Sequence, residues 1–375
     1  MKPLIAIDAR AVEGQFTGIG RYALSLLPLL VAQRPDWRFH LFVTARGRPL
    51  FADLPGDVAI EEVTPVPSHP ASDFWQHVTL PRWLAAHSAS AYFSTAHCVP
   101  ALSGGARRIV TIHDLGPYRF PGMNPWKFDL FLKTNFRLCA TVADAIVADS
   151  QAMADEIESI LGVPRSRIHL ALLGVHPRFR RLNPDELSRI LASRPEIADL
   201  PKGFILSVGE FNPRKNYHRL VAAYAGLKTT VPLVLAGPTG QARASAEQRA
   251  DALGIRERLR FLGYLDDDGL LALYNLAGCF IFPTVYEGFG LPVLEAMACG
   301  TPVLCARTSS IPEVAGEVAL MFDPTSEQAI AEALRRFLFE PELADRLARL
   351  GPTQAANFTW QKTAARTAEI IESCL

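Results

Sequence analysis

Short apolar runs alternate with helix-length amphipathic segments along the whole chain, and this alternation constrains the fold more than any other feature. The runs that predict strands form two groups, over 3–9, 38–44, 91–95, 107–114 and 145–150, and over 203–209, 231–237, 259–265, 279–284, 302–306 and 319–323. Because most of these runs are continuously apolar, the strands are expected to be buried on both faces, as in parallel sheets. Strands that alternate with helices imply right-handed crossovers, so the predicted fold class is α/β, with two doubly wound Rossmann-like sheets.

A polar, proline-bearing segment separates the two groups of predicted strands. A chain of 375 residues is too long for one ordinary hydrophobic core, so two domains are expected. We predict an N-terminal domain over 1–178, an interdomain connection over 179–202, a C-terminal domain over 203–357 and a terminal helix over 358–375 that Thr359 would cap. Two such domains would face each other across a cleft at the carboxyl ends of their strands, where open α/β sheets bind ligands.

Charge and cysteine content exclude several classes of protein. The formal net charge of zero and the pI near 7.1 argue against a nucleic-acid-binding protein. Residues 1–180 hold 18 basic and 15 acidic side chains, an excess that is compatible with an anionic membrane surface but no larger than ordinary scatter. The six cysteines lack the spacing of metal ligands, and no signal peptide or membrane-spanning run is visible. We therefore expect a cytoplasmic protein, at most peripheral at the inner face of the plasma membrane.

The first candidate cluster is the stretch DARAVEGQFTGIGRY, residues 8–22. Gly18 and Gly20 would let backbone N–H groups approach a bound anion, and a helix is expected to begin near Arg21 and Tyr22. The spacing is not that of a dinucleotide-binding loop. The alternative is that these glycines only make a tight strand-to-helix turn.

The second cluster follows the predicted strand over 203–209. Gly209 ends the strand, and the loop then presents Arg214 and Lys215 just before a helix that starts near Tyr217. Adjacent cations at a strand end and a helix N-terminus suit a diphosphate. A solvated basic turn is the alternative.

The third cluster is YEGFGLPVLEAMACGTPV, residues 286–303. Glu287 is expected in the loop before a helix with Pro292 near its start, and Glu295 on the first turn of that helix. Both carboxylates could then address the same space above the helix N-terminus. The alternative makes Glu287 a surface residue and Glu295 a simple helix-start charge.

Together the clusters predict a ligand that carries a diphosphate and many hydroxyls, which is a nucleotide sugar. Phosphate-seeking groups and two carboxylates lie in one domain, and a glycine loop with His113 and Asp114 at a strand end lies in the other. No cluster of His, Asp and Glu has metal-ligand character, so no metal or other cofactor is expected. Arg214, Lys215 and helix dipoles would have to meet the charge of a leaving diphosphate. Asp144 and Asp149 could form a second, catalytic carboxylate pair, but we interpret them as turn residues that flank strands.

The E-x7-E spacing of Glu287 and Glu295, with PRKN at 213–216, GIGRY at 18–22 and TIHDL at 111–115, resembles glycosyltransferase family 4. The resemblance covers nearly the whole chain and implies a retaining enzyme with the two-domain GT-B fold, whose terminal helix crosses back to the N-domain. One departure is Glu210, which stands where many members carry a basic residue after the strand-end glycine.

The resemblance also implies a role for each candidate residue. Glu295 would bind the ribose, Glu287 would face the donor sugar, and Arg214 and Lys215 would neutralise the diphosphate. Catalytic contacts would come from Glu287, His113, Lys215 and Arg214; donor contacts from Glu295, Gly18, Gly20, Phe289, Gly290, Leu291 and Gly209; and acceptor contacts from Asp114, Arg21 and Tyr22.

Within the family, the motifs look most like those of bacterial mannosyltransferases of lipopolysaccharide O-antigen and polysaccharide assembly. That likeness implies transfer of mannose from GDP-mannose to a hydroxyl of a glycan or lipid-linked glycan. A UDP- or dTDP-sugar donor, a nucleotide-sugar isomerase or phosphorylase on the same scaffold, and a catalytically silent binding subunit remain as alternatives. Trp75, Trp83 and Trp126 in the N-domain could stack on sugars or touch lipid, or could pack in the core.

Overall fold

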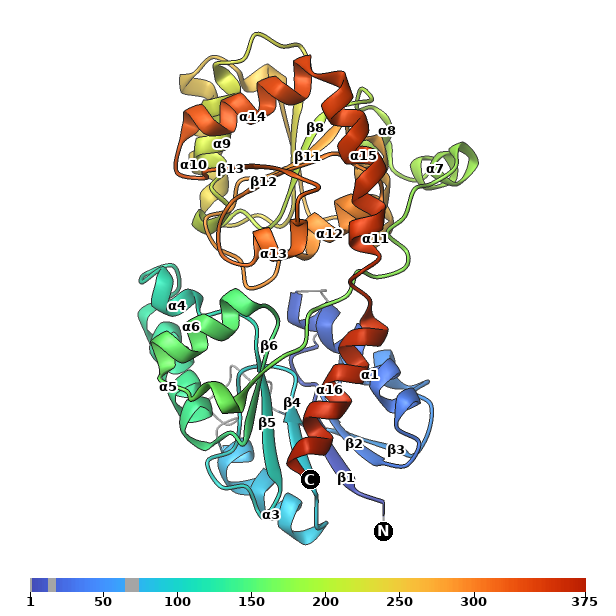
Figure 1. The fold of residues 1–375 in the computed structure, drawn as a ribbon, viewed down its shortest axis with the longest axis vertical. Helices are drawn as coiled ribbons and strands as arrows, with labels where there is room; N and C mark the ends of the chain where they lie inside the picture. Colours follow the sequence, from blue (N-terminus) through green and yellow to red (C-terminus); the bar gives the residue numbers. More distant parts are fainter. Residues whose placement is uncertain (1, 13–17, 65–73) are drawn as a thin grey trace. The chain divides into compact units, whose positions relative to one another are not determined.

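A computed structural model describes residues 2–12, 18–64 and 74–375, which form two compact units (Figure 1). The first unit comprises the chain up to Gly174 together with Thr359–Leu375, and the second comprises Val175–Phe358. Each unit is built around one parallel β-sheet. The stretch expected as an interdomain connection, 179–202, carries two short helices, α7 (Pro184–Leu191) and α8 (Pro195–Ala198), and lies within the second unit.

The sheet of the first unit has seven parallel strands. In order across the sheet they are β3 (Val58–Glu62), β2 (Arg38–Val43), β1 (Leu4–Asp8), β4 (Ala91–Ser94), β5 (Arg107–Ile112), β6 (Ala145–Ala148) and β7 (Ile168–Leu170). The helices of this unit are α1 (Gly18–Gln33), α3 (Leu80–Ala86), α4 (Gly116–Arg119), α5 (Trp126–Val142), α6 (Gln151–Leu161) and α16 (Trp360–Cys374).

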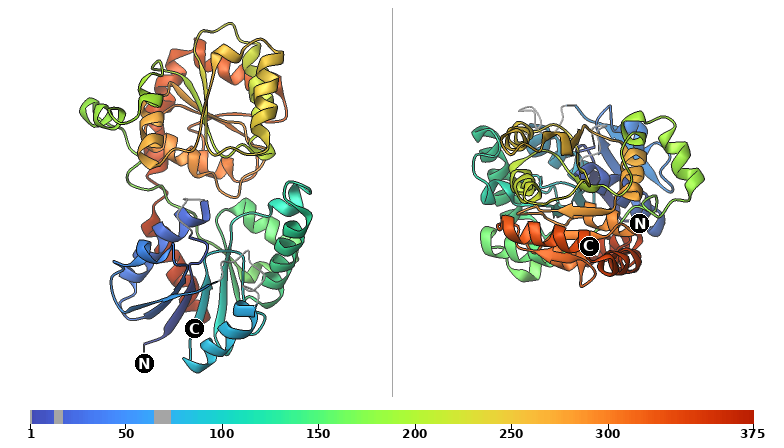
Figure 2. Two further views of the ribbon diagram at one scale, coloured as in Figure 1. Left: turned by 180° about the vertical axis from the view of Figure 1, so that it is seen from behind. Right: turned by 90° about the horizontal axis from the view of Figure 1, so that it is seen from above.

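The sheet of the second unit has six parallel strands, with helices on both faces (Figure 2). Their order is β10 (Leu259–Leu262), β9 (Leu233–Ala236), β8 (Ile205–Val208), β11 (Cys279–Phe282), β12 (Val303–Ala306) and β13 (Leu320–Phe322). The remaining helices are α9 (Tyr217–Ala225), α10 (Ala242–Ala252), α11 (Asp267–Leu276), α12 (Leu291–Ala298), α13 (Ile311–Ala315), α14 (Glu327–Phe339) and α15 (Pro341–Ala355).

Both sheets reverse their strand order once, between β1 and β4 and between β8 and β11. This is the doubly wound Rossmann order, and the predicted fold class is confirmed. Strands β3 and β7 were not predicted from the sequence. They are the two edges of their sheet, and their half-exposed residues VAIEE and IHL lack the continuous apolar run of a central strand.

The core of the second unit shows why its segments form these elements. Ile205, Leu233 and Ile281 project from the central strands onto one face of the sheet, where α9, α10 and α14 bury Leu220, Val221, Ala246, Ala250, Ile330 and Leu334 against them. Burying side chains of this kind stabilises the fold by about 1.5–3 kcal/mol for each large one. A rigid sheet then holds the loops at its strand ends in place.

The terminal helix α16 belongs to the first unit, where it packs beside α1 and against β4 and β6 (Figure 1). Thr359 caps it as expected, because its hydroxyl accepts a hydrogen bond from the Lys362 amide at 3.3 Å. The chain enters this helix against Gly174, where a Cβ would lie 2.1 Å from the amide nitrogen of Trp360.

Candidate active site

The second unit gathers its candidate residues at the point where its strand order reverses. Strands β8 and β11 are neighbours there, and the loops that follow them contain Gly209–Lys215 and Pro283–Gly290. Ligands of open α/β sheets bind at this edge, because loops on either side of the reversal diverge and leave room between them. The second and third sequence clusters are thus brought together by the sheet.

Lys215 lies in a short 3-10 turn, Pro213–Lys215, and its side chain folds back over the end of β8. A Cβ at Gly209 would lie 2.9 Å from Cε of Lys215, and the φ of Gly209 is +151°, so this position requires glycine. The ammonium group lies 4.5 Å from the ring centroid of Phe282. Burial lowers the pKa of Lys215, and the neighbouring Glu287 carboxylate opposes that change.

Glu287 is the acceptor on which these cations converge. Its Oε1 lies 2.7 Å from Nζ of Lys215 and 2.7 Å from a guanidinium nitrogen of Arg214. The hydroxyl of Thr284 donates to the same oxygen at 2.9 Å. Burial would raise the pKa of Glu287, but Arg214 and Lys215 outweigh it and lower the pKa to about 2. The three residues form one ionic cluster, in which Lys215 and Glu287 are buried and Arg214 is partly exposed, and the sequence analysis had placed them in two separate clusters.

Asn216 ties the loop that carries Arg214 and Lys215 to its neighbours. It is 1% exposed and has a φ of +60°, and its amide donates to the carbonyl oxygens of Pro283 at 3.0 Å and Pro324 at 2.8 Å. These carbonyls follow β11 and β13, so one side chain joins three strand ends. Asn tolerates this left-handed conformation better than most residues. Sequence reasoning did not single it out.

The loop that contains Glu287 is fixed by two serines after β12. Ser309 accepts from the Glu287 amide at 3.0 Å, and Ser310 donates to the carbonyls of Glu287 at 2.9 Å and Phe289 at 2.7 Å. Gly290 has a φ of +115°, and a Cβ there would lie 2.6 Å from Ile311 Cδ1. Helix α12 then begins at Leu291. The loop therefore holds a helix N-terminus, which favours anions, next to the ionic cluster.

Glu295 is the fifth residue of α12, at the start of its second turn rather than on the first turn as predicted. It is 6% exposed, and the hydroxyl of Tyr274 donates to its Oε2 at 3.0 Å. The surroundings of the two glutamates thus differ. The carboxylate of Glu287 contacts two cations, and that of Glu295 accepts a hydrogen bond from a phenol. This difference suits an acceptor of hydroxyl hydrogen bonds.

In the first unit, His113 follows β5 and is held by two hydrogen bonds. Its Nδ1 lies 2.6 Å from Oδ2 of Asp149, which follows β6, and its Nε2 lies 2.9 Å from the carbonyl oxygen of Thr95, which follows β4. A carbonyl oxygen can only accept, so Nε2 must carry a hydrogen. Burial lowers the pKa of His113, but Asp149 outweighs it and the pKa is raised. Asp149 is therefore more than a turn residue, because it stabilises the protonated form of His113.

Tyr22 is fully buried, and its surroundings do not suit the expected contact with an acceptor. Its hydroxyl lies 2.9 Å from that of Thr111, and its ring meets the edges of His113 and Trp360 at centroid distances of 4.7 and 6.1 Å. A residue with no exposed surface cannot present its hydroxyl to a glycan. Its place in the structure is to pack His113 against α16.

The other candidates of the first unit lie near the starts of α1 and α4. Gly18 begins α1, three residues before the expected start, with Gly20 buried and Arg21 half-buried in the first turn. Gly14 lies outside the described residues. Asp114 accepts from the Gly116 amide at 2.9 Å and so shapes the turn into α4.

A buried ionic network follows β1 and was not predicted. Arg10, with no exposed surface, donates from Nε to Asp8 Oδ1 at 2.9 Å and from NH2 to Asp8 Oδ2 at 2.6 Å, and Tyr92 donates to Oδ2 at 3.0 Å. The guanidinium lies 3.9 Å from the ring centroid of Trp75. Trp75 therefore belongs to the core. Trp83 is partly buried and packs against Phe42 and His40. Only Trp126 of the three is largely exposed, at 70%.

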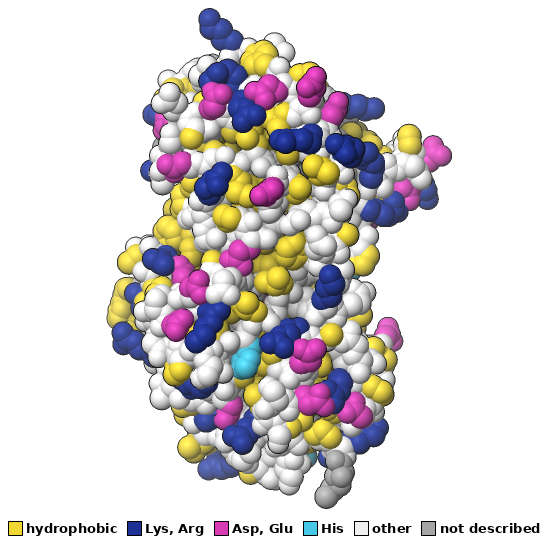
Figure 3. All heavy atoms as spheres, viewed as in Figure 1, with side chains coloured by type: hydrophobic (Ala, Val, Ile, Leu, Met, Phe, Trp, Pro, Cys, Tyr) yellow, Lys and Arg dark blue, Asp and Glu magenta, His cyan; other side chains and the backbone are white. Residues whose placement is uncertain are grey.

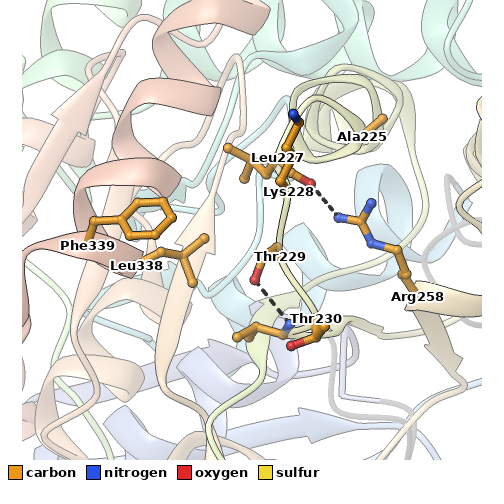
Figure 4. A pocket seen from close by; sticks show the side chains of 9 residues that line it. Ala225, Leu227, Lys228, Thr229, Thr230, Arg258, Leu338 and Phe339 are labelled. Carbon is orange, nitrogen blue, oxygen red and sulfur yellow. Dashed lines mark hydrogen bonds between the residues drawn. The ribbon is translucent and has the colours of Figure 1, made fainter.

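Away from these sites, a hollow of about 620 Å³ lies in the second unit (Figure 4). It is bordered by Lys228, Thr230 and Arg258 on one side and by Leu338 and Phe339 on the other. Val231, also in its lining, precedes β9, so the hollow is at the amino ends of the strands, opposite the ionic cluster. Among the described residues, no group of three or more His, Cys, Asp or Glu could hold a metal ion, and no helix is long and apolar enough to cross a membrane.

Comparison with known proteins identifies the family. The model of "Glycosyltransferase Family 4" matches residues 16–179, and that of "Glycosyl transferases group 1" matches residues 191–354. The O-antigen chain mannosyltransferase B of Escherichia coli is 31% identical over 266 residues, which cover 70% of this chain and 69% of that protein. The serotype-specific mannosyltransferase WbdA of Escherichia coli is 37% identical over 230 residues, which cover 59% of this chain but only 28% of that protein.

Solved structures support the fold. The Anabaena protein Alr3699/HepE, in complex with UDP and glucose, aligns with a TM-score of 0.77 at 19% identity and covers 99% of this chain and 100% of its own. WaaG, a glycosyltransferase involved in lipopolysaccharide biosynthesis, aligns with a TM-score of 0.73 at 17% identity, over 98% and 99% of the two chains. At these identities the likeness concerns the fold alone. The match to most of the O-antigen mannosyltransferase, with family models in both units, shows that this chain is a glycosyltransferase of family 4 with the GT-B fold.

Proposed function

We propose that the chain transfers a mannosyl residue from GDP-mannose to a hydroxyl of a lipid-linked glycan, with retention of configuration, during assembly of a cell-surface polysaccharide. The observation that carries this proposal is the convergence of Arg214, Lys215 and Glu287 at the strand reversal of the second sheet. The choice of mannose rests on the names of the two curated relatives.

In the proposed reaction, the bond between the sugar C1 and the β-phosphate oxygen breaks as a bond from C1 to the acceptor oxygen forms on the same face. The acceptor hydroxyl gives its proton to an oxygen of the leaving phosphate. Arg214, Lys215 and the N-terminus of α12 stabilise the negative charge that develops there. Glu287 faces the positive charge that develops on the sugar ring. No covalent glycosyl-enzyme is needed, because the two glutamates do not flank the bond as a nucleophile and acid would.

The two glutamates divide the donor between them in this proposal. Glu295 accepts hydrogen bonds from the ribose hydroxyls, and Glu287 remains ionised through the reaction, since its pKa is lowered to about 2. In the first unit, we assign His113 to electrostatic support rather than to general base catalysis, because Nε2 donates to a carbonyl oxygen and Nδ1 is held by Asp149. Backbone groups of Phe289, Gly290 and Leu291 complete the donor contacts.

We further propose that the leaving diphosphate is neutralised by Arg214 and Lys215 without a divalent cation. Two adjacent cations, one of them buried, supply the charge that a metal ion supplies in other phosphate sites. Transfer should therefore persist in the presence of EDTA. A strict requirement for a divalent metal would contradict this part of the proposal and leave the rest standing.

The donor is tested by thermal unfolding of the purified protein with GDP, UDP, dTDP, ADP and GDP-mannose. A ligand that binds only the folded state stabilises it by about 2.7 kcal/mol at a hundredfold excess over its Kd, so a preference can be measured. Selective stabilisation by GDP and GDP-mannose supports the proposal. A preference for another nucleotide would overturn the choice of donor, and no response to any nucleotide would overturn the donor site. Release of GDP from GDP-mannose without an acceptor glycan would favour hydrolysis, and conversion of GDP-mannose to another nucleotide sugar would favour an isomerase.

A further inference from the structure

Helix α5 of the first unit presents an apolar face to solvent as well as to the core. Its inward face buries Leu132, Phe136 and Cys139. Its outward face exposes Trp126 at 70% and Leu130 at 57%. Trp126 and Leu130 are four residues apart and therefore adjacent on the helix surface. The outward residues are not needed for packing of the unit, because the opposite face already supplies its core contacts.

Basic residues lie among these apolar side chains. Lys127 and Arg137 are exposed on the same side of α5, and Nζ of Lys127 lies 5.6 Å from the ring centroid of Trp126. The only acidic residue of the helix, Asp129, is 7% exposed and is turned inward, where it accepts from Asn124 Nδ2 at 3.0 Å and from the Gly122 amide at 3.3 Å. The outward face of α5 is therefore apolar and cationic, and has no carboxylate of its own. In Figure 3, hydrophobic and basic side chains adjoin at the left edge, over the α4–α5 region.

We propose that this surface, formed by Trp126, Lys127, Leu130 and Arg137 and called here the α5 surface, docks the protein onto an anionic lipid bilayer. Tryptophan is favoured at the level of the lipid headgroups, and lysine and arginine can extend their charged ends to phosphate while their stems lie along apolar surface. Aromatic and aliphatic side chains mixed with cations are the composition of helices that lie in the membrane interface. The charge of the surface favours an anionic bilayer over a neutral one.

The choice of a bilayer rather than a protein partner rests on the proposed function, since a lipid-linked acceptor is reached only at a membrane. The binding itself requires neither donor nor acceptor. It can therefore be measured apart from the chemistry, and failure of the nucleotide test would not be confused with failure of this one.

The experiment is co-sedimentation of the full chain with sucrose-loaded vesicles, without any nucleotide sugar. Vesicles of pure phosphatidylcholine are compared with vesicles that also contain phosphatidylglycerol. We expect binding to the anionic vesicles that weakens as salt is raised. The double variant Trp126→Ser/Leu130→Ser should bind at least about 100-fold more weakly, because it removes the apolar insertion. The double variant Lys127→Glu/Arg137→Glu should lose the preference for anionic lipid.

Leu102→Ser is the matched control, since Leu102 is 69% exposed in the same unit but lies outside α5. It should bind vesicles as the wild type does, and all variants should unfold at the same temperature and respond equally to nucleotide. Absence of wild-type binding to anionic vesicles, or equal binding by Trp126→Ser/Leu130→Ser, would overturn the proposal. So would a wild-type dimer in solution that the same double variant converts to a monomer, because the occupant would then be a second copy of the chain.

Discussion

His113 and Asp149 are joined by a hydrogen bond of 2.6 Å between Nδ1 and Oδ2, and the side chain of Asp149 is only 2% exposed. The other ring nitrogen of His113 donates to a carbonyl, so with Asp149 ionised the ring carries both protons. Asp114, His97 and Tyr22 also face this pair, and burial together with His113 lowers the pKa of His97, to about 4. His97 is thus neutral at physiological pH, whereas Asp149 shifts the pKa of His113 in the opposite direction.

Asp149→Asn should destabilise the protein and change how its stability depends on pH. Folding raises the pKa of His113 above its usual value of about 6.5, so its contribution is complete below that pH and is lost as pH rises through the folded pKa. Breaking a buried pair of this kind costs about 3 kcal/mol, or roughly 6–12 °C in the unfolding temperature of a domain of this size. Unfolding temperature measured against pH should show a smaller decline above pH 6.5 in the variant.

Asp144→Asn is the control for that experiment, because Asp144 pairs with the partly exposed Arg107 and Arg108 on the surface. If Asp149 acts by keeping His113 charged, the turnover of Asp149→Asn should also recover when the assay pH is lowered. Equal pH profiles for wild type and Asp149→Asn would show that Asp149 has only a structural part.

Lys215→Ala should lower turnover by about 100-fold or more. Removing one preorganised donor from a developing oxyanion has a cost of that size in other enzymes, and Lys215 is buried where its charge is poorly screened. Its loss also leaves Glu287 with Arg214 as its remaining cation. Turnover with a saturating donor is the measurement, and Lys228→Ala, a change at the opposite end of the strands, is the control. Near-normal turnover would remove Lys215 from the leaving-group role.

Glu287→Gln and Glu295→Gln should act in opposite directions on nucleotide binding. Glu287 forms ion pairs with both Arg214 and Lys215. Glutamine at this position removes the competing negative charge, so both cations can bind phosphate more strongly. GDP binding should tighten by about tenfold or more, the equivalent of one charge-assisted hydrogen bond. Transfer should nevertheless be lost. Glu295→Gln removes the proposed ribose acceptor and should weaken GDP binding.

Calorimetric titration with GDP separates these outcomes. Tyr274→Phe is a useful companion, since it removes the phenol that donates to Glu295 without changing the carboxylate. Weaker GDP binding by both glutamine variants would show that Glu287 contributes to nucleotide affinity and does not compete for the cations.

The sequence predicted the central strands because burial on both faces leaves a continuous apolar run. It did not reveal β3 and β7, whose edge positions allow polar residues. Arg214, Lys215, Glu287 and Glu295 were recognised because each lies close to a glycine or proline that marks a strand end. The ion pair between Lys215 and Glu287 was not predicted, because the two residues are 72 positions apart in the chain and come together only through the adjacency of β8 and β11. Asp149 was interpreted as a turn residue for the same reason, because its partner lies 36 residues away after another strand.

Asn216 gives the last prediction, because its two amide hydrogen bonds hold the cationic loop to the ends of β11 and β13. Asn216→Gly retains the left-handed backbone at φ +60° but loses both bonds, and should destabilise the protein by about 2 kcal/mol. Asn216→Ala loses the same bonds and adds the strain of a left-handed alanine, about 1–2 kcal/mol more. Urea unfolding measures both.

Since Asn216 directly follows Lys215, both variants should also weaken GDP binding, in proportion to the freedom that the loop gains. Asn216→Asp separates hydrogen bonding from backbone conformation. It tolerates the same φ and keeps the oxygen that accepts from Arg219 at 2.9 Å, but it sets an anion against two carbonyl oxygens and should be the least stable of the three. Equal stability of the Gly and Ala variants would mean that the backbone at residue 216 leaves its positive φ once the side-chain amide is lost. The hydrogen bonds of Asn216 would then be what imposes that conformation, and backbone strain would not add to the cost of the Ala variant.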